Sequence, residues 1–380
     1  MNSSRPGIEW EIGNQYKHKE RQKMETKQWL LPPDEVRPSH PFLIEAAKLL
    51  RQGEVVAFPT ETVYGLGADA YSDQAVAKIY AAKGRPSDNP LILHFYDPGQ
   101  VKEVVTHLPP LAEELFRRFS PGPLTLILPN NGRASSLATA GLSTVAVRVP
   151  NHPVALALLR EVGRPLAAPS ANRSGKPSPT KAAHVLADLE GRIAGIIDGG
   201  ETGIGLESTV LDITLSPPQI LRPGGITKES LEEVIGKVGV DPALNQSNAP
   251  PKAPGLKYPH YAPRAPLTLV ADLNPSRRRR KMAAQAAERI RDGKRVGILT
   301  TDEDVPYFEE HLPGEPGNHW VILSLGERGN LDGIAQHLYE ALRSFDPLDV
   351  DEIIGESFPK GGIGAAIMNR LSKAAGRILP

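Results

Sequence analysis

The sequence contains no cysteine. This absence excludes disulfides, thiolate catalysis, iron–sulfur clusters and cysteine-type zinc sites. The chain also has no apolar run near the roughly 18–20 residues that span a bilayer, and its N-terminus lacks the apolar core of a signal peptide. We therefore expect a soluble cytoplasmic protein without membrane partners.

Charge of either sign is not in excess, since 44 Lys and Arg residues are balanced by 44 Asp and Glu residues. A neutral chain argues against a dedicated nucleic-acid coat or a polybasic membrane binder, although a local patch is compatible with it. The basic run SRRRRK, Ser276–Lys281, is such a candidate patch. We interpret it as the solvated face of a helix, so direct RNA contact is compatible with the sequence but not expected.

Three familiar catalytic signatures are absent as well: the phosphate loop GxxxxGK[ST], the zinc motif HExxH and the nucleophile elbow GxSxG. A weak likeness to a dinucleotide fingerprint occurs in GLGADA, at Gly65, Gly67 and Ala70. These glycines lie several residues past the preceding strand. We therefore favour the alternative, a tight loop around TETVYG.

The length of 380 residues, 40% of them hydrophobic, allows more than one core and favours two domains. Residues 1–28 are polar and aperiodic and predict a mobile tail, with Met24 as an alternative start. Residues 238–264 are rich in proline and predict a semi-rigid linker. The remaining segments, 29–237 and 265–380, are the predicted domains.

The first domain mixes helices and short β-branched strands. Helical spacing predicts helices over 40–53, 72–84 and 152–163. Short apolar runs predict strands over 54–59, 90–95, 123–129, 144–150, 165–170 and 208–213. Because some strands follow one another directly, we expect a mixed sheet with helices, not a strictly parallel one.

The second domain alternates strands and helices regularly. The predicted strands are 266–271, 295–300, 320–325 and 350–356, and the predicted helices are 276–293, 330–345 and 361–376. This alternation with short loops predicts a parallel, Rossmann-like α/β domain of three layers. Its role is open: it could hold the linker, contact a partner or mediate dimers.

The stretch KGRPSDNPLILH, Lys83 to His94, places two cations on a stiff loop before a strand. The ammonium of Lys83 and the guanidinium of Arg85 together suit a polyphosphate, and Asn89 adds an amide. A solvated turn is the alternative explanation. His94 lies in the following strand, where a lone histidine is usually structural.

Two further polar segments follow predicted strands. Thr60 to Thr62, TET, could hold a small polar ligand at a strand end or could cap the next helix. The segment Pro169–Thr180, PSANRSGKPSPT, presents hydroxyls and backbone N–H groups suited to an anion. Hydroxyl-rich loops are common, so this segment alone is a weak signal.

Arginines also occur on or beside the strands of this domain. Thr144 and Arg148 share one strand face, and an arginine in an apolar strand is costly unless it is paired or meets a ligand. Arg222 precedes Gly224 and Gly225 at another strand end. The combined cations predict a site for a nucleoside triphosphate and a small carboxylate; they are Lys83, Arg85, Arg148 and Arg222.

These motifs together resemble a known family. FPTETVYGLG, KGRPSDNPLILH, STVAVRVP, APSANRSGKPSPT, ESTVLDI and LRPG occur in the order found in YrdC-type L-threonylcarbamoyladenylate synthases. HYAP and GIGAAIMNRLSKAA resemble the long, two-domain branch of that family, so the resemblance covers residues 30–380. It implies a YrdC-like twisted mixed sheet with a concave, positively charged cavity.

The resemblance implies that L-threonine, bicarbonate or CO2, and ATP give threonylcarbamoyl-AMP and pyrophosphate. This is the first step of tRNA N6-threonylcarbamoyladenosine formation, and downstream tRNA threonylcarbamoyl-transfer proteins complete it. Threonine's own amine is the nucleophile, so the protein must align reactants and neutralise phosphate charge. Mg²⁺ is expected to bind through the ATP phosphates, without a dedicated metal site.

Roles for individual residues are likewise implied only by the resemblance. The implied threonine contacts are Thr62, His94, Arg148, Ala168 and Ser208. The implied ATP contacts are Arg85, Asn89, Thr144, Ser170, Ser178 and Arg222. Lys83, Arg85 and Asn172 are implied to be catalytic, and Tyr261 is implied to close over the cavity from the linker. Glu61 and Glu207 are candidates for contacts just outside the substrates.

Two alternatives belong to other classes of function. One is an RNA-binding module that uses the basic concavity, which neutral charge and the lack of stacking-aromatic motifs disfavour. The other is a carbamoyl transferase to a different acceptor, like the similar domains of hydrogenase-maturation proteins. That branch is expected to carry a zinc finger, which a chain without cysteine cannot form.

Overall fold

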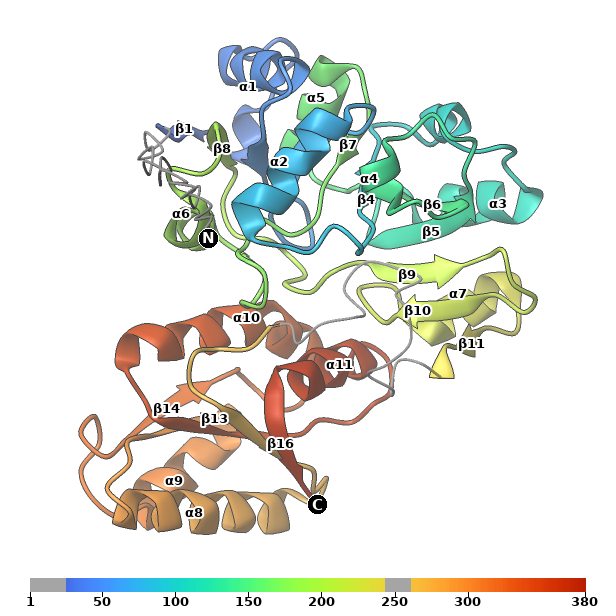
Figure 1. The fold of residues 1–380 in the computed structure, drawn as a ribbon. Coiled ribbons are helices and arrows are strands. Elements are labelled where there is room, and N and C mark those ends of the chain that lie inside the picture. Colours follow the sequence, from blue (N-terminus) through green and yellow to red (C-terminus); the bar gives the residue numbers. More distant parts are fainter. Residues whose placement is uncertain (1–24, 243–260) are drawn as a thin grey trace, which may run out of the picture.

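Two α/β domains make up the computed structural model, which describes residues 25–242 and 261–380 (Figure 1). The N-terminal domain holds an 11-stranded sheet, and the C-terminal domain holds a five-stranded sheet. The expected fold class is confirmed. Within the described ranges, no helix is both long and apolar enough to cross a membrane.

The sheet of the N-terminal domain has the order β1-β8-β2-β3-β7-β4-β6-β5-β9-β10-β11. Its strands are β1 (Lys27–Leu30), β2 (Val56–Phe58), β3 (Gly65–Asp69), β4 (Ile92–His94), β5 (Leu124–Pro129), β6 (Thr144–Arg148), β7 (Leu166–Ala167), β8 (Gly195–Asp198), β9 (Thr209–Asp212), β10 (Gln219–Arg222) and β11 (Gly239–Val240). The sheet combines parallel pairs such as β4–β6 with antiparallel pairs such as β5–β6, so it is mixed, as expected.

Helices cover both faces of this sheet. They are α1 (Pro41–Arg51), α2 (Asp73–Lys83), α3 (Pro110–Phe119), α4 (Ser136–Thr139), α5 (Pro153–Val162), α6 (Ala182–Leu189) and α7 (Lys228–Ile235). Alternate residues of a strand point to opposite faces. Val55 and Ala57 therefore join the core under α2, α3 and α6, whereas Val56 and Phe58 join the core under α1 and α5.

The glycines of GLGADA lie in β3, which pairs antiparallel with β2. The dinucleotide fingerprint is therefore wrong, whereas the expected loop around TETVYG is present, with bends at Glu61–Val63 and its Gly65 beginning β3. Gly67 is needed because a Cβ there would lie 2.8 Å from the Phe58 ring, which packs across the strand. Because TET leads into this strand and not into a helix, the helix-cap alternative for Thr60 and Thr62 is also wrong.

The predicted domain boundaries shift at both ends of the first domain. Residues 1–24 of the predicted tail and 243–260 of the predicted linker lie outside the described residues. Lys27 and Gln28 pair with β8, so strand β1 begins inside the predicted tail. At the other end, Gly239 and Val240 pair with β10, which places the first residues of the predicted linker in the sheet.

The C-terminal sheet is entirely parallel, with the order β14-β13-β15-β12-β16. Its elements are β12 (Leu267–Val270), α8 (Pro275–Arg291), β13 (Val296–Thr300), α9 (Val305–His311), β14 (Trp320–Ser324), α10 (Leu331–Leu348), β15 (Glu352–Glu356), α11 (Gly364–Ala374) and β16 (Ala375–Leu379). The sequence prediction missed β16, whose first two residues were assigned to the preceding helix.

The basic run SRRRRK lies on α8, as expected, but it is not a solvated face throughout. Arg278 is buried against the sheet and forms ion pairs with Glu356 and Asp304. Arg277 pairs with Asp272 at the start of the helix. The prediction is therefore wrong for Arg278, because its side chain points toward the carboxyl ends of β13 and β15.

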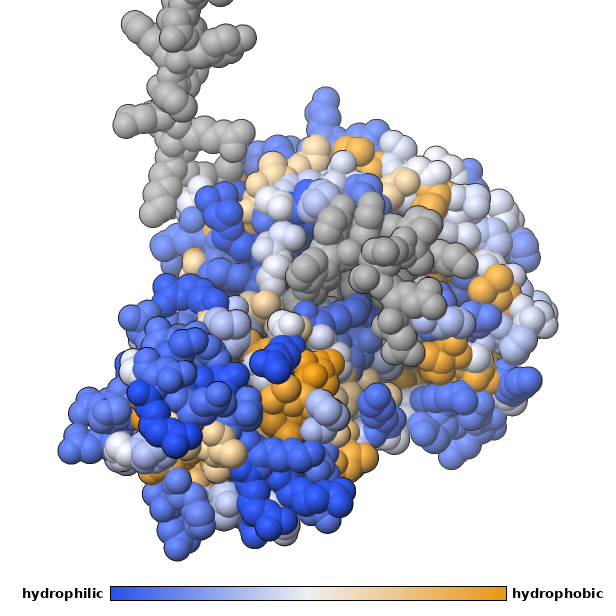
Figure 2. All heavy atoms as spheres, turned by 60° about the horizontal axis from the view of Figure 1, so that its bottom comes forward, coloured by the Kyte–Doolittle hydropathy of each residue, from blue (hydrophilic) through white to orange (hydrophobic). Residues whose placement is uncertain are grey.

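The two domains meet through α10 and α11, which lie between the C-terminal sheet and the N-terminal domain (Figure 1). The core beneath these helices takes in Val63 and Leu206 of the N-terminal domain. Gly205, at φ +77°, comes so close to α10 that a Cβ would lie 2.4 Å from Gln336 Cα. In Figure 2, by contrast, the outer side of the C-terminal domain is mostly hydrophilic, with hydrophobic residues gathered in a small area.

Candidate active site

A cavity opens on the face of the N-terminal sheet that carries Ala146 and Arg148 of β6 and Ile92 and His94 of β4. Ile92, Ala146 and neighbouring apolar residues form a small buried cluster there. Loops that follow β2, α2 and β7 complete the wall. The cavity therefore collects polar motifs that are far apart in the sequence.

Most of the predicted site residues meet at this cavity. Those that line it are Thr62, Arg85, His94, Arg148, Ala168, Ser170, Asn172, Ser178, Ser208, Arg222 and Tyr261. Three predicted residues do not line it: Lys83, Asn89 and Thr144. Glu207, which the sequence suggested only as an outer contact, is part of the wall.

Arg148 forms the polar floor of one end of the cavity. Its Nη2 lies 2.8 Å from Glu61 Oε1 and donates to Thr62 Oγ1 at 3.1 Å. Thr60 holds the loop in turn, because its hydroxyl donates to the Val63 carbonyl at 2.7 Å and accepts the N–H groups of Thr62 and Val63. A guanidinium only 4% exposed is thus held at the end of β6 against a fixed loop, which suits recognition of a small carboxylate.

His94 is a neutral wall residue. Burial and the nearby charge of Arg148 lower its pKa to about 3. Its Nδ1 lies 3.2 Å from the Ile92 carbonyl, and a neutral imidazole contacts a carbonyl through its N–H, so Nε2 is left as an acceptor. His94 can therefore receive a hydrogen bond from a ligand without adding positive charge.

Two further arginines reach the cavity, one from the loop after α2 and one from the end of β10. Ser72 caps α2 and Gly84 ends it at φ 62°, which brings Arg85 back across the cavity. Arg85 Nη2 donates to the carbonyls of Asn89 and Pro90 within its own loop, both at 3.3 Å. Burial lowers the pKa of Arg85 to about 10, so it stays charged at neutral pH.

Arg222, at the end of β10, is held by Ser208. Its Nε donates to the Ser208 carbonyl and its Nη2 to the Ser208 hydroxyl, each at 3.1 Å. Among the described residues, the cavity wall then holds three arginines and one glutamate. Burying cations in this excess is costly unless an anion compensates them. The wall is accordingly suited to phosphate as well as carboxylate groups.

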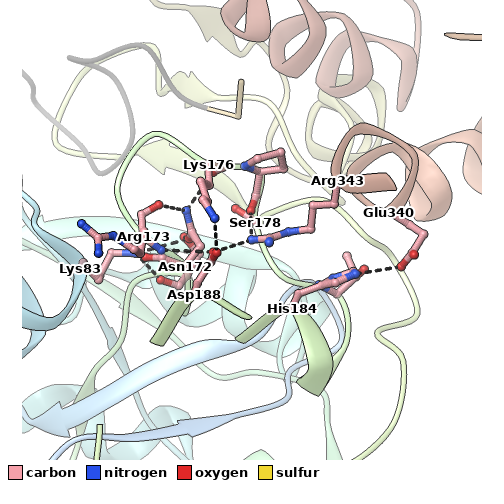
Figure 3. A network of polar contacts seen from close by, with 12 residues as sticks. Lys83, Asn172, Arg173, Lys176, Ser178, His184, Asp188, Glu340 and Arg343 are labelled. Carbon is pink, nitrogen blue, oxygen red and sulfur yellow. Dashed lines mark hydrogen bonds and ion pairs between the residues drawn. The ribbon is translucent and has the colours of Figure 1, made fainter. Parts of the chain in front are cut away.

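Lys83 holds the loop 169–180 in place (Figure 3). Its Nζ contacts the Ser170 carbonyl at 2.5 Å and the Asn172 carbonyl at 2.6 Å. The Asn172 side chain accepts from the Ser170 hydroxyl at 2.6 Å and donates to the Lys176 carbonyl at 2.8 Å. Burial and Arg85 lower the pKa of Lys83. The lysine thus faces the loop backbone, while Ser170 and Asn172 face the cavity.

Glu207 joins the cavity to the C-terminal domain. It accepts hydrogen bonds from Ser178 at 2.5 Å, from Tyr339 at 2.9 Å and from Arg370 Nε at 2.7 Å. Burial disfavours its charge, but Arg370 and Arg222 outweigh burial and lower the pKa of Glu207 to about 2. The carboxylate is therefore charged and fixed.

Tyr261 closes this side of the cavity. It is buried, adopts a φ of 71°, and its ring stacks on Tyr339 at a centroid distance of 5.3 Å. Arg370 lies over the same ring at 5.6 Å. An aromatic residue from the end of the predicted linker thus lines the cavity.

Sequence reasoning missed the residues that the C-terminal domain contributes here. Tyr339 and Arg370 lie on α10 and α11, 132 and 163 residues from Glu207 in the chain. Both helices were predicted, yet nothing in their periodicity distinguishes these positions from core positions. The available signal was the ending GIGAAIMNRLSKAA, which includes Arg370. It indicated the family but did not indicate that Arg370 lies near the cavity.

Fold and cavity together define a YrdC-like α/β domain with an arginine-rich cavity wall, completed by a Rossmann-like domain. Residues 48–224 match a family model described as "Telomere recombination", whose family includes Sua5, YciO and YrdC. Residues 226–376 match the "Threonylcarbamoyl-AMP synthase, C-terminal domain". Both halves of the chain therefore correspond to one two-domain architecture.

The similarity extends over whole proteins. The chain is 54% identical over 355 residues to the Threonylcarbamoyl-AMP synthase of Bacillus subtilis, covering 93% of this chain and 99% of that protein. It is 47% identical to the one from Pyrococcus abyssi, covering 87% and 93%. The crystal structure of P. abyssi Sua5 complexed with L-threonine superposes with a TM-score of 0.85 at 44% identity, covering 93% and 99%. The chain belongs to the threonylcarbamoyl-AMP synthase family.

Proposed function

We propose that the protein condenses L-threonine, bicarbonate and ATP into threonylcarbamoyl-AMP and pyrophosphate. The threonine amine adds to bicarbonate-derived CO2 and loses a proton, which gives a carbamate. The carbamate oxygen attacks the α-phosphorus of ATP, and the bond to the β-phosphate oxygen breaks. The supporting observation is the cavity wall, which combines a carboxylate-binding arginine with two further arginines and several hydroxyls.

Threonine fits the end of the cavity formed by β4 and β6. Arg148 would pair with its carboxylate, taking up the donor that now contacts Thr62. The neutral Nε2 of His94 would accept from its hydroxyl or amine. A neutral acceptor is favourable here because a protonated histidine would repel both Arg148 and a protonated amine.

The triphosphate fits the opposite wall. Arg85 and Arg222 would neutralise the charge that develops on the phosphates, and the hydroxyls of Ser170 and Ser178 would orient them. Lys83 would act through the loop that it holds, since its Nζ already contacts the Ser170 and Asn172 carbonyls. No protein nucleophile is required, because both attacking atoms belong to the substrates.

The donor set does not form a magnesium cage. Within residues 25–242 and 261–380, no group of three or more His, Cys, Asp or Glu side chains converges on a metal position. Glu207, the carboxylate in the wall, is engaged by Ser178, Tyr339 and Arg370. Mg²⁺ would therefore enter with the ATP phosphates and supply charge neutralisation there.

Pyrophosphate release from ATP tests the proposal when threonine or bicarbonate is omitted in turn. We expect release only when all three substrates are present, together with incorporation of labelled bicarbonate into an adenylate. Release without threonine would indicate another acceptor and would contradict the proposed substrate. An absence of release with all three would contradict the proposed reaction.

The partners of the reaction follow from its product. A mixed anhydride of a carbamate and AMP is labile in water, so it must pass quickly to an acceptor. We propose that tRNA threonylcarbamoyl-transfer proteins consume it in the cytoplasm. When the transfer proteins and unmodified tRNA are added, adenosine in the tRNA should be converted to threonylcarbamoyladenosine. tRNA that stays unmodified would contradict this step.

A further inference from the structure

We propose that α10 and α11 of the C-terminal domain position the loop 169–180, with Tyr339, Arg343 and Arg370 as positioning residues for ATP. The inference rests on the proposed function, because it takes this loop to contact the nucleotide. It assigns the C-terminal domain a direct part in building the active site. None of the three side chains lines the cavity, so each acts through another residue.

The N-terminal half of the loop is fixed from within its own domain. Lys83 contacts the carbonyls of Ser170 and Asn172, as described above. Nothing comparable from α2 reaches the second half of the described loop, which contains Gly175 at φ 93° and the wall residue Ser178. Within the N-terminal domain this half is held at Lys176, by Asn172 and Asp188, and at the Pro179 carbonyl, which accepts the Tyr64 N–H. Between these points, the contacts to the Pro177 carbonyl and, through Glu207, to the Ser178 hydroxyl come from the C-terminal domain.

Arg343 supplies the first of these contacts (Figure 3). Its Nη2 donates to the Pro177 carbonyl at 2.5 Å and to Asp188 Oδ2 at 2.8 Å. Asp188, whose side chain is fully buried, also pairs with Lys176 at 2.8 Å and accepts the Arg173 N–H at 3.3 Å. One arginine of α10 thereby fixes the backbone immediately before Ser178.

Tyr339 and Arg370 supply the second contact, one residue further on. Tyr339 lies four residues before Arg343 on α10, so both side chains leave the same helix face. Through Glu207, Tyr339 and Arg370 fix the hydroxyl of Ser178. The backbone at Pro177 and the side chain at Ser178 are thus both held from the C-terminal domain.

Because these groups are buried, the loss of any one of the contacts is energetically costly. Tyr339 and Arg370 are both fully buried, and Arg343 is only 10% exposed. In such surroundings an unpaired carboxylate or carbonyl is costly, so the loop follows the helices when they move or lose a donor. Misplacement of a phosphate contact by about 1 Å is enough to lower a rate about a hundredfold.

Arg343→Gln in the full chain is the main test, and Arg295→Gln is its matched control. Arg295 also donates to a carbonyl, that of Leu348 at 2.6 Å, but this contact stays within the C-terminal domain. Tyr339→Phe is the second variant, since it keeps the ring that stacks on Tyr261 and removes only the hydroxyl. Arg343→Lys retains one charge and should rescue part of the loss.

Two measurements are needed. Hydrogen–deuterium exchange of peptides from 169–180 should accelerate by about tenfold or more in Arg343→Gln and Tyr339→Phe, and not in Arg295→Gln. Steady-state kinetics of Arg343→Gln should show KM for ATP raised about tenfold or more, with equilibrium binding of threonine within about twofold of wild type. If Arg343 had only a general structural role, its loss would weaken the binding of ATP and of threonine to a similar extent.

Unchanged exchange in both interface variants would overturn the inference. Faster exchange with an unchanged KM for ATP would also overturn it. The same holds if Arg343→Gln weakens binding of ATP and of threonine equally and Arg295→Gln has the same effect. If the wild-type protein releases no pyrophosphate, the proposed function fails separately. The exchange measurement still applies in that case: acceleration supports loop positioning by the C-terminal domain, and its absence overturns it.

Discussion

Both domains contain a group of buried or half-buried arginines, but the two groups have different surroundings. In the C-terminal domain, Arg278 contacts Glu356 and lies 3.7 Å from Asp304, while Arg328 reaches Asp304 at 2.6 Å. Arg279 pairs with the same aspartate at 3.5 Å. In the N-terminal domain, the arginines of the cavity wall border open space: among the described residues Arg148 pairs with Glu61, and Glu207, the carboxylate of the wall, is engaged by Arg370.

The comparison shows that a buried arginine is not by itself a sign of a binding site. Each described arginine of the C-terminal group meets a carboxylate at the carboxyl ends of β13 and β15, so charge is balanced within the protein. Around the cavity, Arg85, Arg148, Arg222 and Arg370 outnumber Glu61 and Glu207, the carboxylates that pair with Arg148 and Arg370 among the described residues. An excess of buried cations beside a cavity distinguishes a site from a structural cluster.

The largest expected effect concerns the structural cluster. Arg278→Met should lower the free energy of unfolding by about 3–5 kcal/mol, because it leaves the buried Glu356 without its charged partner. Urea unfolding measures this change, and kcat/KM per folded molecule should stay near wild type. Adding Glu356→Leu should recover much of the stability; a selective loss of catalysis in the single variant would contradict the assignment.

The next effect concerns the cavity. Arg85→Gln should lower kcat about 10²–10³-fold, as expected for loss of a donor that stabilises transition-state charge. Stability should change little, because among the described residues the hydrogen bonds of Arg85 go to carbonyls of its own loop. Arg328→Gln is the matched variant and should show the reverse pattern, with lower stability and normal turnover. If the two variants lost stability and turnover to the same extent, the cavity arginines and the C-terminal arginines would not differ in role.

The smallest effect concerns the neutral His94. An unfolded histidine has a pKa near 6.5, whereas that of His94 is lowered to about 3 by burial and Arg148. Between these values the unfolded state binds a proton that the folded state does not, so stability falls as pH drops from 6.5 toward 3. His94→Asn should reduce this slope in urea unfolding at several pH values. The exposed His107→Asn should leave it unchanged; an identical slope in both variants would contradict a neutral His94.

Much of the fold could be predicted because its signals are local. The alternation in TVAVR placed Thr144 and Arg148 on one face, and the structure has them in β6. The strand–helix alternation of the second half predicted the parallel sheet. Short strands without strong alternation, such as β1 and β11, were missed because their pairing depends on distant partners, β8 and β10.

The candidate site was predictable to a similar extent. The motifs named most residues of the cavity wall, since each follows a strand or helix end that the fold brings to one face. The positions of Lys83, Asn89 and Thr144 outside the wall were not predictable, because the direction of a side chain at the end of an element or in a loop depends on its final packing. The implied roles, catalytic for Lys83 and toward ATP for Asn89 and Thr144, remain predictions.

The sequence by itself determined the order of helices and strands, the two domains and the family motifs, because hydrophobic periodicity and short motifs act over a few residues. Tertiary structure alone decided which charges meet. Glu207 meets Arg370 across 163 residues, and Arg278 is buried within a run of four arginines that look alike in the sequence. The reason is physical: the free energy of a buried charge depends on partners and solvent that only the packed domains supply.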